Sequence, residues 1–474
     1  MIDELKPYTD YKDSGVAWLG KVPEHWGIPP GFAAFREKCV KNKGMQEDTV
    51  LSLSYGRIVV KPKDKLHGLV PESFETYQIV TPGDIIVRST DLQNDWNSMR
   101  VGLVRNRGII TSAYLCFQVI SPLDPDYAHA LLHTFDLMKV FYGLGSGLRQ
   151  NLSFLDFKRM LILTPPPEEQ AAIVRFLDYA NAKIERAIRA KRKLIGLLNE
   201  QKQAIIHRAV TRGVDPNVKL KPSGIPWIGD VPKHWEVRRL RTMVHTIDQG
   251  ISPQAIGFVA EGNSWGVLKS GCVNHGVFRQ TEHKQLSSAL VIDPSIVVKV
   301  GDVIISRACG SPKLVGSVGR VRTLDYRLIL SDKTFRAVFK LFVNVDFIVY
   351  AMNSPYYRQQ VEQAISGAEG MANNLPLSEL RSFVFFVPPS DEAKVIASFI
   401  DHELDQIIKE IVRGEREIAL LREYRTTLTA EVVTGKLDVR EAAKRLPDQA
   451  DELLPADESL DDLIDDEITE EVEA

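Results

Sequence analysis

Two long stretches of the chain carry apolar side chains at every third or fourth position, a spacing typical of a helix with one buried face. Each stretch follows a proline-rich stop, PPPEEQ at Pro165 and PPSDEA at Pro388, whose acidic residues fall in the first helical turn, where the dipole favours negative charge. The pattern predicts helices over 165–212 and 388–440. Their apolar positions share one heptad register, and the predicted seam consists of Leu177, Ile184, Ile188, Ile195, Leu198, Ile205, Ile400, Leu404, Ile407, Ile411, Ile418, Leu421 and Leu428.

A helix over 168–210 would be about 64 Å long at 1.5 Å per residue, which is more than a small globule can cover. We therefore expect the two seams to pack against each other, although each could instead be a core helix of its own globule. The link over 211–235 is rich in proline and glycine, which lets the chain turn back and favours an antiparallel pair. Two globules would then lie at opposite ends of a two-helix spacer.

Each long helix follows a region of shorter elements. Short apolar runs in the first region predict strands at 50–60, 83–88 and 109–120 and a helix over 127–141. In the second region they predict strands at 302–307 and 327–339 and a helix over 346–365. The predicted fold class is α+β, with two mostly-β globules separated by two long antiparallel coiled-coil-like helices and an internal pseudo-two-fold repeat.

The repeat is visible in the sequence itself. SGVAWLGKVPEHW at 14–26 recurs as SGIPWIGDVPKHW at 223–235, with 8 of 13 positions identical at an offset of 209. A Gly-Asp turn before an apolar run recurs at an offset of 218, and the segment around PPPEEQ recurs at an offset of 223. The repeated motifs at the two ends of each copy, which we call the frame, are therefore constant, whereas the sequence between them varies in length. The predicted domains are a first globule (1–164), a first long helix (165–212), a linker and second globule (213–387), a second long helix (388–440) and an acidic, disordered tail (441–474).

Charge is distributed unevenly. The segment 448–474 holds 13 acidic residues and no Lys or Arg, whereas residues 1–447 carry a net charge of +10, which suits a body that approaches a polyanion. No apolar stretch is long enough to span a bilayer, and the first 15 residues lack the apolar core of a secretory signal, so we expect a cytoplasmic protein. The dispersed cysteines Cys39, Cys116, Cys272 and Cys309 form no CxxC pair and predict buried free thiols.

The frame SGxxWxGxVPxHW, the strand after Gly-Asp, the PPxxEQ motif and the duplicated long helix resemble the specificity subunit of a type I restriction-modification system. The resemblance covers about residues 11–440, although PPSDEA in the second copy replaces the glutamine. It implies that each globule is a target-recognition domain that reads one half of a split double-stranded DNA target. It also implies that the helices fix the spacing and dock two modification (methyltransferase) subunits, with restriction (motor-nuclease) subunits completing the complex.

The same resemblance implies that this chain is not an enzyme and carries no catalytic, cofactor-binding or metal-binding residues. S-adenosylmethionine, Mg²⁺ and ATP would be handled by the partner subunits. The chain ends should also lie close together, because the repeat is complete only if the segment after TGKLD at 434–438 is continued by YKDSGVAWLG at 11–20.

Base reading requires Arg, Lys, Asn or Gln side chains that reach base edges from loops. Such residues follow the two Gly-Asp strands and fill the glycine-rich loops before each proline stop. Helix C-capping would also explain the glycines of those loops. The candidate DNA-binding residues are Arg88, Gln93, Asn94, Arg149, Gln150, Asn151, Arg307, Lys313, Asn373 and Asn374.

Two other functions fit parts of the sequence. One is a coiled-coil adaptor with two protein-binding globules, which would show little DNA preference. The other is a stand-alone DNA methyltransferase, suggested by FYGLG at 141–145 and NSPY at 353–356. These strings lie in different copies of the repeat, and FYGLG lacks the buried strand that a cofactor loop needs, so neither is expected to form a site. His25 and His234 are expected to be frame residues beside Trp26 and Trp235.

Overall fold

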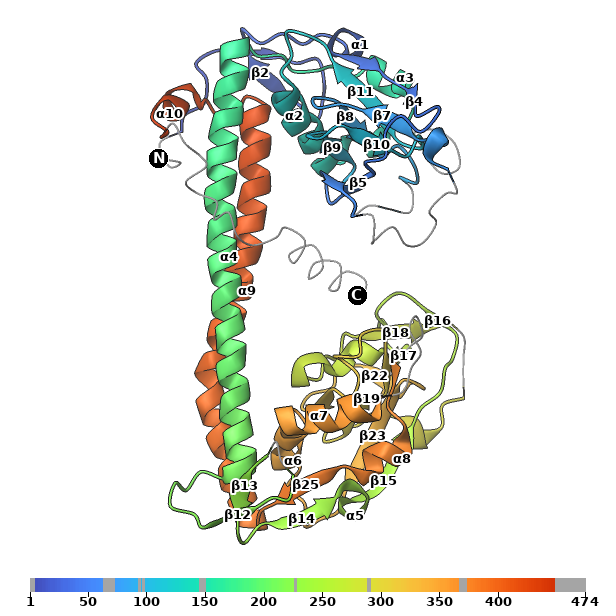
Figure 1. Ribbon diagram of the computed structural model, residues 1–474, viewed down its shortest axis with the longest axis vertical. Helices are drawn as coiled ribbons and strands as arrows, with labels where there is room; N and C mark the ends of the chain where they lie inside the picture. The colour runs from blue at the N-terminus through green and yellow to red at the C-terminus, as the bar shows by residue number, and fades with distance from the viewer. Residues whose placement is uncertain are drawn as a thin grey trace. The chain divides into compact units, whose positions relative to one another are not determined.

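The structure is a computed structural model that describes residues 5–62, 73–92, 95, 99–144, 151–225, 228–287, 291–365 and 373–447 (Figure 1). The chain divides into two compact units, and the division falls inside both long helices. Unit 1 contains the chain up to Lys191 together with the segment that begins at Glu415, and unit 2 contains Arg192–Gly414. Each unit therefore combines one globule with part of each long helix.

Unit 1 is built on a four-stranded antiparallel sheet of order β3-β11-β8-β9. Its strands are β3 (Phe35–Glu37), β11 (Leu115–Val119), β8 (Ile85–Val87) and β9 (Val101–Leu103). A second sheet has the order β10-β7-β4, with β10 (Gly108–Ile110), β7 (Gln78–Val80) and β4 (Val40–Lys41). The remaining elements of the globule are β1 (Tyr11–Asp13), β2 (Lys21–Pro23), β5 (Leu51–Ser54), β6 (Arg57–Val60), α1 (Gly31–Ala34), α2 (Pro125–Leu137) and α3 (Phe154–Lys158).

Unit 2 repeats the main sheet of unit 1 in the same spatial order, β15-β23-β19-β21. These strands are β15 (Val244–Gln249), β23 (Thr334–Phe339), β19 (Val303–Ser306) and β21 (Val318–Arg320). A second sheet, β16-β18-β17-β22, contains β16 (Ala255–Ile256), β18 (His283–Leu286), β17 (Trp265–Leu268) and β22 (Arg327–Ile329). The other elements are β12 (Leu220–Pro222), β13 (Asp230–Pro232), β14 (Glu236–Arg239), β20 (Ala308–Cys309), β24 (Asn373–Asn374), β25 (Val384–Val387), α5 (Leu240–Met243), α6 (Val345–Ala351), α7 (Pro355–Ala364) and α8 (Leu377–Ser382).

Several elements predicted as single pieces are divided in the structure. The run 50–60 is a hairpin, β5 and β6, because Tyr55 and Gly56 both adopt positive φ (45° and 76°), as a tight type I′ turn requires. The run 327–339 supplies β22 and β23 to two different sheets. The predicted helix over 346–365 is broken into α6 and α7, because Pro355 occupies the first turn of α7 and cannot continue the preceding helix.

The long helices are α4 (Pro167–Arg212) and α9 (Ser390–Val433), each starting two residues after its predicted start (Figure 1). They pair antiparallel within each unit. In unit 1, Glu185 Oε2 lies 3.3 Å from Arg425 Nη1, and Lys191 pairs with Glu417, so the residue number falls on α9 as it rises on α4. In unit 2, Gly414 lies against Ile195 at a point where a Cβ atom would be 3.2 Å from the Ile195 side chain.

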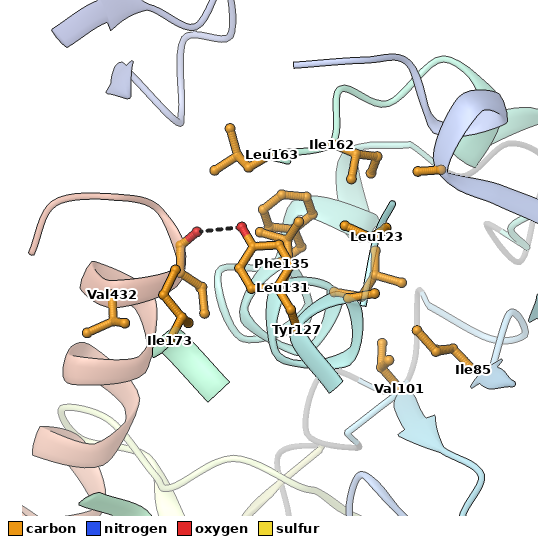
Figure 2. Packing of buried hydrophobic residues seen from close by; sticks show 14 of the residues in the cluster. Ile85, Val101, Leu123, Tyr127, Leu131, Phe135, Ile162, Leu163, Ile173 and Val432 are labelled. Atoms are coloured by element: carbon orange, nitrogen blue, oxygen red, sulfur yellow. Dashed lines mark hydrogen bonds between the residues drawn. The ribbon is translucent and has the colours of Figure 1, made fainter. Parts of the chain in front are cut away.

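The core of unit 1 joins the globule to both helices. Figure 2 shows Tyr127 of α2 beside Ile173 of α4 and Val432 of α9, and the Tyr127 hydroxyl donates to the Val433 carbonyl at 3.4 Å. All three side chains are buried. In unit 2 the residue at the position of Tyr127 is Phe347 of α6, which packs in one cluster with Val210 of α4 and Ile396 of α9. Each globule therefore shares an apolar core with the helix segments of its own unit, in addition to any surface contacts.

The described ends of the chain meet in unit 1, as the repeat predicts. Lys6 forms an antiparallel bridge with Asp438, whose amide donates to the Lys6 carbonyl at 2.8 Å. The predicted tail at 441–474 begins too early, because residues 440–444 form α10 (Arg440–Lys444), and Ala443 of this helix and Leu446 after it are buried in the core of unit 1. Residues 448–474 lie outside the described residues.

Candidate nucleic-acid interface

In unit 1 the two described candidate residues, Arg88 and Asn151, lie where the strand after Gly-Asp ends. Loop 1 is the segment 88–95 that follows β8, described at 88–92 and 95. Asn151 lies against it, because the Asn151 side-chain carbonyl accepts from the Asp91 amide at 3.1 Å and the Leu152 amide donates to the Ser89 carbonyl at 2.8 Å. Arg88 Nη1 lies 3.0 Å from Asp95 Oδ2. Gln93, Asn94, Arg149 and Gln150 lie outside the described residues.

Unit 2 brings its candidates together in the same way. Loop 2 is the segment 307–316 that follows β19. β20 within this loop pairs with β24, so that Asn373 lies opposite Cys309 and Asn374 opposite Ala308. Asn373 Nδ2 also donates to the Gly310 carbonyl at 3.2 Å. Lys313 is exposed on the same loop, so Arg307, Lys313, Asn373 and Asn374 form one neighbourhood.

The two arginines that follow the matched strands are not equivalent. The Leu152 amide donates to the Ser89 carbonyl, and the corresponding Leu375 amide donates to the Arg307 carbonyl at 2.9 Å. Arg307 therefore matches Ser89, and Arg88 matches the buried Ser306. Because successive side chains of an extended chain point to opposite sides, the two loops present different chemistry at equivalent positions. This is the behaviour expected of two surfaces that recognise different ligands.

Both arginines already have partners within the protein. Arg88 pairs with Asp95, and Arg307 Nη1 donates to the Asp332 carbonyl at 3.0 Å while its guanidinium lies 5.8 Å from the centre of the Phe335 ring. These contacts fix the direction of each side chain.

Sequence reasoning missed the side chains that hold these loops from inside. Arg100, fully buried at the start of β9, donates to main-chain carbonyls of loop 1, and Arg358 of α7 donates to carbonyls of loop 2. An arginine in a polar run such as NDWNSMR gives no indication that it is buried. Only the fold, which sets the run beside the loop, reveals the role.

The repeated frame motif has a structural task in each unit. Trp26 Nε1 donates to Glu169 Oε1 at 3.0 Å, and His25 Nε2 lies 2.8 Å from Glu169 Oε2. In unit 2, Trp235 Nε1 and His234 Nε2 contact the two oxygens of Glu392 at 3.0 and 2.6 Å. Glu169 in the first turn of α4 and Glu392 in the first turn of α9 thus bind the His-Trp pair of the frame motif in their own unit. His25 and His234 are frame residues, as expected from their place in the repeated motif.

Tyr8 adds a third donor to this arrangement in unit 1. Its hydroxyl donates to Glu169 Oε1, and both Tyr8 and Glu169 are buried. Burial and the contact with Glu169 raise the pKa of Tyr8 well above its ordinary value, so the hydroxyl keeps its proton at all ordinary pH.

The predicted seam faces the interior of the helix pair. Leu177, Ile184, Ile188, Ile400, Leu404, Ile407, Ile418 and Leu428 are buried, and Ile195, Leu198, Ile205, Ile411 and Leu421 are half-buried. Of the half-buried residues, Leu198, Ile205 and Ile411 pack against the core cluster of unit 2. The seam thus has the exposure expected when two long helices cover each other.

The strings that suggested a methyltransferase are structural. Asn353 donates its side-chain amide to the carbonyls of Val318 and Val349 at 2.9 and 2.8 Å, and NSPY forms the start of α7. Phe141 is buried in a short 3₁₀ turn over Val140–Gly143, and Gly145 lies outside the described residues. Neither string forms a cofactor loop in the part of the chain that the structure describes.

The cysteines are free, but only two are fully buried. Burial raises the pKa of Cys116 to about 12 and that of Cys272 above its ordinary value, so both are protonated and unreactive. Cys39 is exposed and Cys309 half-buried, which corrects the expectation that all four are buried. Among the described residues, no cluster of His, Cys, Asp and Glu could hold a metal ion. No helix within the described ranges is long and apolar enough to cross a membrane.

No family model matches the chain. Over 371 residues it is 25% identical to the type I restriction enzyme MjaVIII specificity subunit of Methanocaldococcus jannaschii, a match that covers 76% of this chain and 82% of that protein. Over 177 residues it is 28% identical to the type I restriction enzyme EcoEI specificity subunit of Escherichia coli, which covers 36% of this chain and 29% of that one.

A solved structure, described as the structural basis of complex assembly and conformational transition of the type I R-M system, shares the fold. It superposes with a TM-score of 0.55 at 15% identity and covers 88% of this chain and 99% of that one. The repeated frame motif, the repeated sheet order and the sequence likeness over three quarters of the chain make this protein similar to the specificity subunits of type I restriction enzymes.

Proposed function

We propose that this chain is the subunit that selects a bipartite double-stranded DNA target, with one half-site read by unit 1 and the other by unit 2. The observation that carries the proposal is the repeated sheet with unlike loops. β3-β11-β8-β9 and β15-β23-β19-β21 have the same order, while the loops that leave β8 and β19 present different side chains at equivalent positions. A shared scaffold with divergent loops suits two readers of two different sequences.

The charge of the chain supports a nucleic-acid partner. Residues 1–447 carry a net charge of +10, so contacts to phosphates would supply much of the affinity. The candidate base-reading residues remain those of the two loops and their neighbours, among them Arg88, Asn151, Arg307, Lys313 and Asn373. Binding should therefore weaken steeply as salt is added, and the loop residues should decide which sequence is preferred.

The partners belong to the same proposal. Two modification subunits would dock on the chain, and restriction subunits would join them. S-adenosylmethionine, Mg²⁺ and ATP would be bound by those subunits, and this chain would contribute recognition and scaffolding. The antiparallel helix pair suits such a role, because its pseudo-symmetry offers two similar surfaces to two copies of one partner.

The test is methylation mapping in a host that expresses this chain with its modification subunit, compared with a host that lacks only this chain. The proposal expects a split motif that disappears without the chain. A chimera that replaces residues 213–387 with the same region of another specificity subunit should change one half of the motif and leave the other half intact. Methylation that is unchanged by deletion would overturn the proposal and favour an adaptor.

A further inference from the structure

Arg100 uses every hydrogen-bond donor of its side chain inside unit 1. The side chain is fully buried. Its Nη1 and Nη2 atoms donate to the main-chain carbonyls of Arg88, Thr90, Asp91 and Asp95 at 3.3, 2.8, 3.3 and 2.6 Å. Its Nε donates to the Tyr142 hydroxyl at 3.1 Å, which accounts for all five donors of a guanidinium. The side chain thus acts as a template for the described part of loop 1.

Tyr142 completes the arrangement. Its hydroxyl donates to the Asp95 carbonyl at 2.8 Å, and its ring lies 5.3 Å below the Arg100 guanidinium. The main chain of Arg100 is fixed as well, because its amide donates to Asp136 at 2.5 Å and its carbonyl accepts from the Arg88 amide at 2.8 Å. The position of Arg100 is therefore fixed by contacts of its own main chain and by Tyr142, independently of its contacts with the loop.

Unit 2 reaches the same result with residues from another element. Arg358 of α7 donates through Nη1 to the Lys313 carbonyl at 2.8 Å and through Nη2 to the Val315 carbonyl at 2.6 Å. The neighbouring Tyr357 donates its hydroxyl to the Gly316 carbonyl at 2.9 Å. Burial lowers the pKa of Arg358, which still leaves it charged at neutral pH.

The repeat does not explain this parallel. The Arg88 amide donates to the Arg100 carbonyl, and the Ser306 amide donates to the Ser317 carbonyl, so the residue of unit 2 that matches Arg100 is Ser317. The arginine of unit 2 comes instead from a helix 41 residues further along the chain. The same contact, an arginine and a tyrosine on the carbonyls of one loop, is built twice from unlike positions. A need shared by the two loops accounts for this better than common descent of the residues.

Both loops need donors for their main-chain carbonyls. Loop 1 and the part of loop 2 after β20 leave the sheet, so their carbonyls lack ladder partners and must find other donors when they are buried. A guanidinium offers several donors in one rigid plane, which fixes the positions of several carbonyls at once. Side chains that read bases tolerate only small errors in position, so the loop must be held from within.

We propose that Arg100 with Tyr142, and Arg358 with Tyr357, are positioning residues that set the conformation of the two loops and thereby the sequence preference of each unit. This inference rests on the proposed function. Neither pair touches DNA in this role. Each acts only through the main chain of its own loop, so its effects are confined to one half-site.

The test uses four single variants of the full chain, each expressed with the modification subunit: Tyr142→Phe and Arg100→Lys in unit 1, Tyr357→Phe and Arg358→Lys in unit 2. Methylation of targets with one mismatched base is compared between half-sites. The unit 1 variants should lose about tenfold of their discrimination, the worth of one good base contact, in one half-site only. The unit 2 variants should do the same in the other half-site, so each pair controls for the other.

A second measurement does not depend on DNA. Hydrogen exchange of the purified full chain should become faster in the amides of loop 1 in Tyr142→Phe, which keeps the ring and removes only the hydroxyl, with exchange in α4 unchanged. Equal loss of discrimination in both half-sites, or unchanged exchange in the loop, would overturn the inference. If the unaltered chain directs no split motif, the proposed function fails, and the exchange measurement still decides whether the loop is positioned as described.

Discussion

Replacing Glu169 by alanine should destabilise unit 1 far more than the same change at Glu392 destabilises unit 2. Glu169 is 4% exposed and accepts from two buried donors, the Trp26 indole and the Tyr8 hydroxyl, and contacts the more exposed His25. A buried donor left without a partner costs about 1–3 kcal/mol, so two of them predict a loss of about 2–6 kcal/mol. Water can replace the contact with His25, whose side chain is 42% exposed.

The matched acid of unit 2 provides the comparison. Glu392 is 29% exposed and contacts Trp235 and His234, of which only the tryptophan is buried. Its removal leaves one buried donor, which predicts a loss of about 1–3 kcal/mol. The two variants should therefore differ by at least about 1 kcal/mol, or roughly fivefold in the equilibrium of local opening.

Hydrogen exchange is the suitable assay, because a chain of two units does not unfold in one step and exchange reports each unit separately. The first turns of α4 and α9 are the segments to follow. Glu168→Ala and Asp391→Ala are the controls, because both remove an exposed acid from the same first turn; they measure the contribution of the helix dipole, together with an exposed ion pair to Lys394 in the case of Asp391. Equal losses in Glu169→Ala and Glu392→Ala, or losses no larger than those of the controls, would refute the count of buried donors.

Three further predictions concern pH, helix pairing and the chain ends. Burial lowers the pKa of His129 and of His133 to about 4. The nearby charge of Arg105 contributes for His129, and the charges of His129 and Arg425 contribute for His133. The unfolded chain therefore takes up protons at these histidines from pH 6.5 downward, whereas the folded chain does not. Unit 1 should lose stability as the pH falls from 6.5 to 4, and a variant with glutamine at both positions should show a flatter dependence in urea unfolding monitored by exchange; equal slopes would contradict this. The ion pair between Glu185 and Arg425 should show a coupling energy of roughly 0.2–1 kcal/mol in a double-mutant cycle that reverses both charges, although the loss of the Glu185 contact with Arg189 is not restored; additive losses would show that the pair contributes nothing. A circular permutant that joins the described ends near Lys6 and Asp438 and opens at Val214 should still fold and bind its partners. Size-exclusion chromatography with the modification subunit measures this binding. A permutant that folds but no longer binds would count against the circular arrangement.

The sequence predicted the features that repeat. The frame motif, the two long helices and their seam follow from periodicity and proline stops, and the starts of α4 and α9 lie two residues from their predicted positions. The helical spacing over 346–365 predicts one helix, but Pro355 within it separates α6 from α7. Local signals thus locate element ends well when they are given their full weight.

Contacts between distant segments could not be predicted. Glu169 was placed correctly in a first helical turn, but its partners lie more than 140 residues away in the chain. Arg100 is fully buried, although the polar residues around it in the sequence give no indication of burial. The one-residue shift between Arg88 and Arg307 follows from the offset of 218 between the Gly-Asp strands, and the main-chain hydrogen bonds to Leu152 and Leu375 agree with it.

The joining of Lys6 to Asp438 has a consequence for the order in which the protein is made. The described part of unit 2 is one continuous segment, Arg192–Gly414, so it can fold as soon as it leaves the ribosome, whereas unit 1 needs the segment that begins at Glu415 to cover Tyr127 and Ile173. At about 5–20 residues per second, the more than 200 residues in between take roughly 10–50 s to synthesise. During that interval the apolar face of the nascent first globule stays uncovered. We therefore expect the beginning of the protein to be the last part to mature, and a chain cut short before α9 to be recognised by chaperones and proteases through its N-terminal half.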